Sequence, residues 1–162
     1  AALTGHLVLS TLHTNDAISA FTRLVDMGVE PFLVATPIRA VQAQRLVRRL
    51  CPHCARPHAV PARIEAEARV FAERVLPGVA PRWMEAVGCS QCLNTGYRGR
   101  LGIYEMVPVT ERMQHLIVSG ASVNDMKALA REEGCRFLRD DGLLKAWQGL
   151  TTVEEVLRVA GS

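Results

Sequence analysis

Two pairs of cysteines constrain this chain more than any other feature of its sequence. The first pair reads Cys51-Pro-His-Cys54, the second reads Cys89-Ser-Gln-Cys92, and residues 55–88 separate them. Each C-x-x-C turn presents two sulfurs to one point, and two such turns supply the four thiolates of a tetrahedral zinc ion. The spacing predicts a structural zinc site, because four sulfur ligands leave no open position for a reactive water.

Three other interpretations of these cysteines stay open. A disulfide framework is typical of secreted domains, but no signal peptide opens the chain. A thioredoxin-like redox pair needs a single motif at a helix start after a strand, not two matched motifs. Four buried thiols without a metal would share the same spacing. His53 and His58 could act as ligands, although four cysteines make them superfluous.

The segment around the cysteine pairs has an unusual composition. Five of the eight prolines lie between Pro52 and Pro81, and a charged helix is predicted over residues 62–75. Such a segment has few apolar residues with which to fold by burial alone. Zinc binding contributes on the order of 10–16 kcal/mol in small structural sites. We therefore expect the metal to organise an inserted subdomain.

A short apolar run near the N-terminus predicts the start of an α/β core. His6–Thr11 lies between Gly5 and a polar turn, a pattern typical of a strand buried on both faces of a parallel sheet. The helix predicted next has Thr14 or Asn15 as its N-cap and ends at Gly28. Strand, turn and helix in this order form half of a βαβ unit.

Residues 31–50 are predicted to be helical, with a break at Pro37. In the second part of this helix, three- and four-residue spacing places Arg45 on one face with Arg48 or Arg49. These arginines would contact nucleotide phosphates or a neighbouring subunit. The alternative is a solvated cationic face, and the sequence does not decide between the two.

The C-terminal third is predicted to be helical after one strand. Leu101–Val107 forms a strand punctuated by glycine, and residues 110–162 show helical periodicity. Ser122 opens a pattern like a capping box, and Thr151 or Thr152 caps a further helix.

Composition excludes several classes of protein. Hydrophobic residues make up 49% of the chain against 22% charged, which suffices for a folded core. No apolar run approaches the roughly 18 residues of a membrane span. The net charge of +3 and an aromatic content of 5% are low for a protein that binds nucleic acid. The chain does not begin with Met, and we expect it to be a fragment of a longer protein.

Several segments together resemble one known family. "LTGHLVLSTLHTNDA", "GVEPFLVATPIRAVQAQRLVRRLCPHC", "GYRGRLGIYEM" and "LRDDGLLKAWQGLTTVEEVLRV" occur here in the family's order. They resemble the traffic ATPases of type II secretion and type IV pilus assembly, the first segment being similar to the family's histidine box. The four cysteines and the tail favour the type II secretion members.

The resemblance implies an α/β fold: the C-terminal part of a RecA-like core with an inserted four-cysteine zinc subdomain and an all-helical C-terminal subdomain. It divides the chain into a partial core over residues 1–50, the zinc subdomain over 51–100, a strand returning to the core over 101–109, and the helical subdomain over 110–162.

The family also implies a function for the full-length protein. Its members are homo-hexamers that use ATP and magnesium, and their ATP hydrolysis drives pseudopilus assembly and protein export. They work in the cytoplasm, peripheral to the inner membrane, with the platform proteins of that membrane as partners. This chain contains no G-x-x-x-x-G-K-[ST] phosphate loop and no acidic Walker B strand. We expect it to be inactive alone.

The histidine segment supplies the candidate catalytic residues. A straight strand would hold His6 and His13 roughly 23 Å apart, so the two cannot reach one phosphate. Ligands of α/β sheets lie beyond the carboxyl ends of strands, which favours His13 as a sensor of the γ-phosphate, with Thr11 and Thr14 beside it. His6 would orient a loop or face a subunit interface. Alternatively, each histidine is only a hydrogen-bonded polar residue at a strand end.

Other functions compatible with the sequence are a type IV pilus assembly ATPase segment, a zinc-ribbon module that binds nucleic acid, and a docking domain that uses the helical tail. The low charge and few aromatic residues argue against nucleic acid as a partner.

Overall fold

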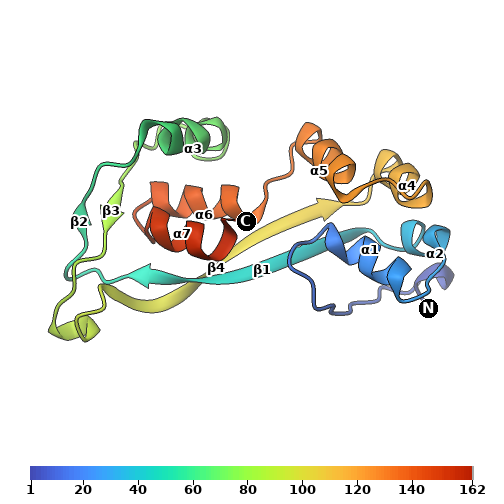
Figure 1. Ribbon diagram of the computed structural model, residues 1–162, viewed down its shortest axis with the longest axis horizontal. Coiled ribbons are helices and arrows are strands. Elements are labelled where there is room, and N and C mark those ends of the chain that lie inside the picture. The colour runs from blue at the N-terminus through green and yellow to red at the C-terminus, as the bar shows by residue number, and fades with distance from the viewer. Residues whose placement is uncertain (162) are drawn as a thin grey trace. The chain divides into compact units, whose positions relative to one another are not determined.

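A computed structural model describes residues 1–161 and shows a mixed α/β chain (Figure 1). The elements in chain order are η1 (Ala2–Thr4), α1 (Ser19–Asp26), α2 (Pro31–Ala35), β1 (Ala40–Leu50), β2 (Arg56–Pro57), α3 (Ala62–Val75), β3 (Met84–Glu85), η2 (Ser90–Cys92), β4 (Tyr97–Pro108), α4 (Glu111–Val118), α5 (Val123–Glu132), α6 (Leu138–Trp147) and α7 (Val153–Ala160).

The chain forms two compact units, each made of two separate stretches of sequence. Unit 1 contains residues 1–43 and 105–136, and unit 2 contains residues 44–104 and 137–161. The RecA-like core and the four-part division expected from the sequence are not tested by this partition, and they stay predictions.

In unit 1, the helices α1, α2, α4 and α5 pack in succession, α1 on α2, α2 on α4 and α4 on α5. The helix α1 begins at Ser19, later than the predicted cap at Thr14 or Asn15, and the Asp16 carboxylate accepts from the Ser19 N–H at 2.8 Å. As predicted, this helix ends just before Gly28, whose φ of 88° only glycine adopts readily.

The predicted buried strand over His6–Thr11 is wrong. This run is neither strand nor helix, and its Leu7 and Leu9 side chains are 87% and 89% exposed. The reason is that a strand needs the backbone groups of a neighbour, and none of the described strands pairs with this run. An apolar sequence favours burial, but it does not supply the partner.

The predicted helix over residues 38–50 is also wrong, because this stretch forms the strand β1. The break at Pro37 is confirmed, since α2 ends at Ala35. Along β1 the buried residues are Ala43, Val47 and Leu50, at spacings of four and three that a helix would also produce. Which residues of β1 are buried depends on the elements that pack against the strand. Here the buried residues have the spacing that is typical of a helix.

The strand β1 pairs with β4 in a two-stranded sheet. At one end the Cys51 N–H donates to the Gly96 carbonyl, and at the other the Val109 N–H donates to the Arg39 carbonyl, both at 2.9 Å. The pairing is therefore antiparallel, as the opposed arrows in Figure 1 show. The predicted strand Leu101–Val107 is confirmed within β4, where Ile103, Glu105 and Val107 are buried in strict alternation.

Unit 2 has a core built from α3, α6 and α7. The helix α6 packs on both α7 and α3, and the predicted helix over residues 62–75 coincides with α3. Trp83 and Trp147 meet edge to face, with ring centroids 5.5 Å apart. The other buried members of this core are Ile64, Ala68, Ala72, Leu143, Leu144, Ala146, Val153 and Val156.

The predicted caps of the C-terminal helices are confirmed. Ser122 and Asp125 form a reciprocal capping box at the start of α5, and the Thr152 hydroxyl accepts from the Glu155 N–H at the start of α7. The helix α6 begins at Leu138, and the Asp140 carboxylate in its first turn accepts from the Phe137 N–H at 2.8 Å.

Of the helices in the described residues, none combines the length and the hydropathy that a bilayer crossing requires.

Candidate metal centre

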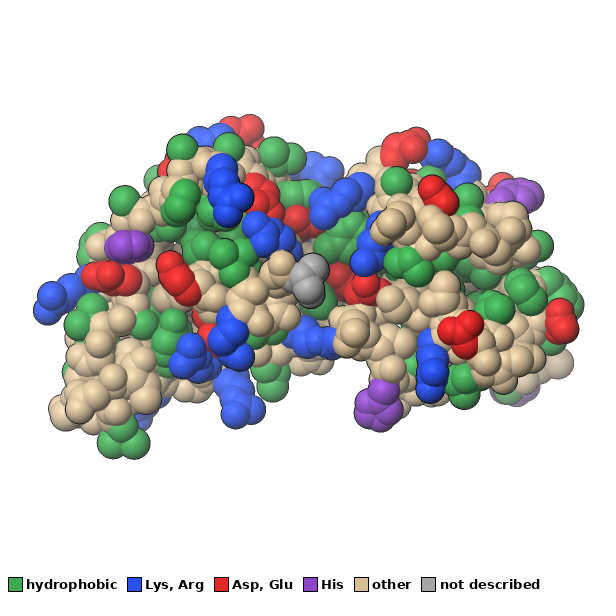
Figure 2. Space-filling view, viewed as in Figure 1, with side chains coloured by type: hydrophobic (Ala, Val, Ile, Leu, Met, Phe, Trp, Pro, Cys, Tyr) green, Lys and Arg blue, Asp and Glu red, His purple; other side chains and the backbone are tan. Residues whose placement is uncertain are grey.

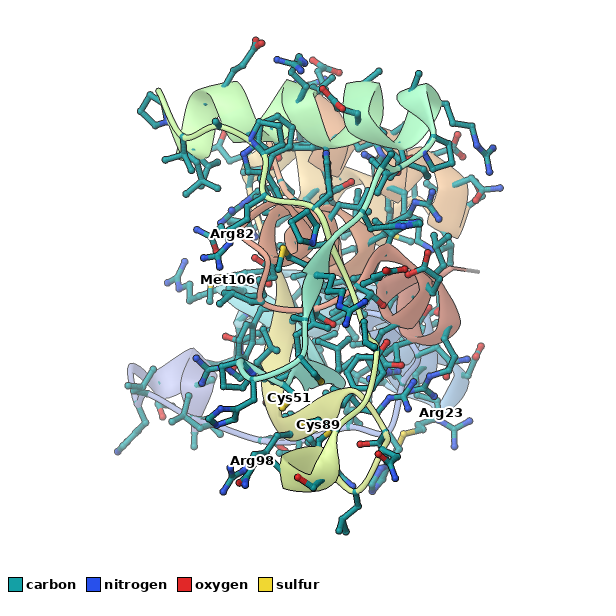
Figure 3. All side chains as sticks on the ribbon, turned by 90° about the vertical axis from the view of Figure 1, so that its left-hand side faces the viewer. Arg23, Cys51, Arg82, Cys89, Arg98 and Met106 are labelled. Carbon is teal, nitrogen blue, oxygen red and sulfur yellow. The ribbon has the colours of Figure 1, made fainter. Side chains whose placement is uncertain are left out.

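The structure brings the four predicted metal ligands to one point in unit 2. The Sγ atoms of Cys51, Cys54, Cys89 and Cys92 all lie within 4.8 Å of one another. Three of these separations are 3.9 Å for Cys51 and Cys89, 3.8 Å for Cys54 and Cys92, and 3.8 Å for Cys89 and Cys92. Figure 3 shows Cys51 and Cys89, which come from two different turns, side by side.

These separations suit a zinc ion. With zinc–sulfur bonds near 2.3 Å, the edge of a sulfur tetrahedron is about 3.8 Å. A disulfide would instead hold two sulfurs about 2.05 Å apart. All four cysteines are free thiols. The geometry therefore fits a tetrahedral metal site and not a pair of disulfides.

The first turn follows directly from the strand β1. Cys51 continues the ladder with its N–H to the Gly96 carbonyl, and the chain then turns so that the N–H groups of Cys54 and Ala55 both donate to the Cys51 carbonyl, at 3.4 and 3.1 Å. The sheet thus fixes Cys51, and the turn brings Cys54 back beside it.

The second turn depends on residues with left-handed backbone. After η2 the residues Leu93 and Asn94 have φ values of 52° and 60°, so that the chain reverses tightly around Cys92. Gly88 and Gly96 flank the turn with φ values of 115° and 76°. A Cβ on Gly96 would lie 2.6 Å from the Ala86 Cβ, so only glycine fits this close approach.

Backbone N–H groups surround the sulfurs. The Gly88 N–H donates to the Cys54 Sγ at 3.3 Å, and the N–H groups of Cys89 and Gly96 donate to the Cys92 Sγ at 3.2 Å each. Hydrogen bonds of this kind stabilise thiolate over thiol and orient the ligand.

These contacts shift the pKa values of two of the thiols in opposite directions. Burial raises the pKa of Cys92, but the N–H donors of Cys89 and Gly96 outweigh it, and the pKa falls to about 6. For Cys54 burial and the neighbouring thiols outweigh the Gly88 N–H, and the pKa rises to about 11.

The predicted nucleotide-sensing residues lie in unit 1, and none of them belongs to the described cluster of cysteines. His6, Thr11 and His13 are exposed. The His6 Nδ1 lies 3.2 Å from the Thr4 hydroxyl, and the Thr14 hydroxyl donates to the Asp16 carbonyl at 2.9 Å. The roles assigned to these residues stay predictions.

The predicted interface arginines lie in unit 2, on β1, and the helical face assigned to them does not exist. Arg48 donates twice to the Glu155 carboxylate, at 3.0 and 2.7 Å, and its guanidinium stacks on the Tyr97 ring at 4.0 Å from the centroid. Arg45 donates to the Gln44 carbonyl at 2.9 Å. An interface role for Arg45 and Arg48 stays a prediction.

The partner of Arg48 is Glu155, which the sequence patterns did not predict. Its side chain is fully buried and also accepts two hydrogen bonds from Arg158, at 2.8 and 2.6 Å. Burial raises the pKa of Glu155, but the hydrogen bonds from Arg158 and Arg48 outweigh that effect and hold the pKa at about 2. The three-residue spacing between Glu155 and Arg158 was the one sequence signal that could have indicated an ion pair at this carboxylate.

Together, the fold and the cluster define a mixed α/β chain with a metal-ready pair of C-x-x-C turns. The chain is also similar in sequence to known proteins. The sequence model of the family described as "Type II/IV secretion system protein" matches residues 1–158. The chain belongs to this family, and the resemblance noted in its sequence is confirmed.

Individual relatives agree with the family match. The chain is 52% identical to the type II secretion system protein E of Pseudomonas aeruginosa over 98% of its length, 47% identical to the type IV pilus assembly ATPase PilB of Thermus thermophilus over 97%, and 46% identical to the type II secretion system ATPase E of Vibrio cholerae over 98%. It spans only 30%, 17% and 30% of these three relatives, respectively.

Proposed function

We propose that this chain is the C-terminal segment of a type II secretion ATPase. In the full-length protein, a homo-hexamer in the cytoplasm would hydrolyse ATP with magnesium at the face of the inner membrane. The hydrolysis would drive pseudopilus assembly and protein export through platform proteins of that membrane. The observation that carries the proposal is the 52% identity to a type II secretion system protein E over 98% of the chain.

Within that motor, the four cysteines would hold zinc as a structural ion. Cys51, Cys54, Cys89 and Cys92 would fill all four tetrahedral positions, so the ion would cross-link the two turns without activating a water. The donors are thiolates, which suit zinc better than the oxygen-preferring magnesium or calcium.

The pilus assembly ATPases are the second candidate, since a Thermus thermophilus member is 47% identical over 97% of the chain.

A segment exchange distinguishes the two candidate functions. This chain would replace the matching segment of the Pseudomonas aeruginosa type II protein E, or of the pilus ATPase PilB of the same species. We expect exoprotein secretion to return to at least half its normal level in the first graft and pilus formation to stay below a tenth in the second. Restored pili without restored secretion would refute the assignment.

The chain alone should not turn over ATP, because it lacks the phosphate loop that cradles the β- and γ-phosphates. A coupled ATPase assay on the purified chain checks this directly. Nucleic acid is not proposed as a partner, and a gel-shift assay at low salt would reveal it if this were wrong.

We further propose that His13 senses the γ-phosphate in the full-length ATPase. Substituting His13→Ala should lower turnover about 10- to 100-fold, the loss of one hydrogen bond to a charged group. His115→Ala is the control, because His115 is also exposed in unit 1 but lies on α4, outside the histidine segment. Equal turnover in both variants and the unmodified protein would refute the role.

A further inference from the structure

Three arginines line one pocket of unit 2, beside the first cysteine turn. Arg49, Arg82 and Arg98 border a hollow of about 570 Å³, and none of the described residues that line it is acidic. Figure 3 shows Arg82 and Arg98 projecting on the same side of the ribbon, and Figure 2 shows Lys and Arg side chains gathered below β1 and β4 of unit 2. The charge of this pocket is therefore of one sign.

The backbone holds two of these arginines close together. The Cys51 N–H donates to the Gly96 carbonyl, which joins the end of β1 that contains Arg49 to the end of β4 that contains Arg98. Like charges held close together on paired strands repel each other. No carboxylate among the described residues pairs with Arg49, Arg82 or Arg98, in contrast to Arg48, which has Glu155.

The walls of the pocket are apolar and fixed. Leu50, Met84 and Leu150 contribute to the lining, and the Leu50 N–H donates to the Leu150 carbonyl at 2.9 Å. The Arg82 N–H donates to the Trp147 carbonyl at 2.7 Å, which anchors its backbone to the end of α6. An apolar lining beside three exposed guanidinium groups suits a ligand that carries both apolar and anionic parts.

We propose that this pocket binds an acidic segment of a partner protein, with two or more carboxylates beside one apolar side chain. The carboxylates would pair with the guanidinium forks of Arg49, Arg82 and Arg98, and the apolar side chain would cover Leu50 and Leu150. Arginine and methionine are enriched at protein interfaces, and arginine is frequent among the residues that dominate binding. The lining offers no aromatic ring on which a nucleotide base could stack.

A rival explanation is that the arginines only balance the charge of the metal centre. A zinc ion with four thiolates carries two negative charges, and Cys51 itself lines the pocket. This explanation predicts that the arginines control zinc affinity and not peptide binding, so one set of variants separates the two.

The test uses the zinc-loaded chain and fluorescein-labelled pentapeptides with Asp or Glu around one Leu, Ile or Phe, at constant ionic strength. Matched peptides carry Asn and Gln in place of Asp and Glu. Fluorescence anisotropy measures the dissociation constant. The pocket variant combines Arg49→Gln, Arg82→Gln and Arg98→Gln. The control variant makes the same change at Arg23, Arg63 and Arg100, which are exposed and do not line the pocket.

We expect at least one acidic peptide to bind, with its dissociation constant raised tenfold or more in the pocket variant and less than twofold in the control variant. The amide peptides should not bind. Several results would overturn the proposal: no acidic peptide bound at millimolar concentration, equal losses in the two variants, or zinc affinity reduced while peptide binding is unchanged. Binding of pyrophosphate in place of the acidic peptides would assign the pocket to phosphate ligands and also overturn it.

Discussion

Glu155 is a fully buried carboxylate that accepts hydrogen bonds from two arginines. It connects the helix α7 to the strand β1. It lies in the first turn of α7, and one of its oxygens also accepts the backbone N–H of Arg48 on β1 at 3.0 Å. The Thr151 hydroxyl donates to the Arg48 carbonyl at 2.8 Å, next to this contact. The charge is therefore buried with its hydrogen-bonding capacity largely used, which is the condition under which burial is tolerated.

Replacing this carboxylate tests its role. Glu155→Gln should lower the free energy of unfolding of unit 2 by about 1–3 kcal/mol, because part of the arginine hydrogen bonding is left unmet. Glu154→Gln is the matched control, since Glu154 occupies the same helical turn but is exposed, and it should change stability by less than about 0.5 kcal/mol. Urea denaturation measures both. Equal effects would show that the buried ion pair contributes nothing.

The depressed pKa of Glu155 also predicts a pH dependence. Its pKa falls from 4.5 to about 2 in the folded chain, so the unfolded state binds the proton more readily. The stabilisation is present above pH 4.5 and is lost as the pH falls from there toward 2. The stability difference between the unmodified chain and Glu155→Gln should therefore shrink over this interval, and urea midpoints at a series of pH values would show whether it does.

At the scale of elements, the two cysteine turns act as one unit joined through the end of the β1–β4 sheet. We expect the purified chain to contain about one zinc per molecule. Cys89→Ser should lower zinc affinity at least about a hundredfold, because the loss of a ligand should weaken binding more than a change in a residue that only contacts a ligand. Cys135→Ser is the control, because Cys135 lies outside the cluster. Competition with a chromophoric chelator gives the affinities. A folded chain without metal and with freely reacting thiols would contradict the site.

The close approach of Gly96 to Ala86 gives a second prediction for this element. Gly96→Ala would add both a strained φ and an overlap with the Ala86 Cβ. Gly99→Ala adds the strained φ alone, since its φ is 80° and nothing lies within 4 Å of the added Cβ. Gly96→Ala should cost at least about 1 kcal/mol more than Gly99→Ala, the lower end of the usual cost of overpacking. Thermal unfolding of the zinc-loaded variants measures the difference, and equal costs would remove the steric argument.

At the scale of the whole molecule, each unit is assembled from stretches far apart in the chain. Unit 2 takes its core from residues 44–104 and from the C-terminal helices, with the second stretch of unit 1 intervening in sequence. A core of this kind forms only when both stretches are present, so its unfolding should be cooperative. Both tryptophans of the chain, Trp83 and Trp147, lie in it. Tryptophan fluorescence therefore reports the unfolding of unit 2.

Truncation of one core side chain should weaken the whole of unit 2. Leu143→Ala should cost about 2–5 kcal/mol, because Leu143 is 1% exposed between α3 and α7. Val70→Ala removes a side chain that is 68% exposed on α3, and it should cost less than about 1 kcal/mol. A single fluorescence transition that shifts to lower urea in Leu143→Ala is the expected result. Two separate transitions would show that α3 and α6 do not share one core.

Features that depend on a few consecutive residues could be predicted from the sequence. The C-x-x-C turns, the helix caps at Ser122 and Thr152, the break at Pro37 and the end of α1 at Gly28 were all predicted correctly, because the local backbone and side chains carry the interaction. The charged stretch over residues 62–75 likewise predicted α3 over its full length.

Features that need a distant partner could be recognised only in the folded chain. Residues 40–50 become a strand because β4 supplies the facing backbone, and His6–Thr11 has no such partner among the described strands. The pairing of Arg48 with Glu155 and the meeting of Arg49, Arg82 and Arg98 at one pocket follow from the same cause. Hydrogen-bond ladders and ion pairs join residues that are far apart in the chain. No local sequence pattern marks such a contact, so it becomes visible only in the fold.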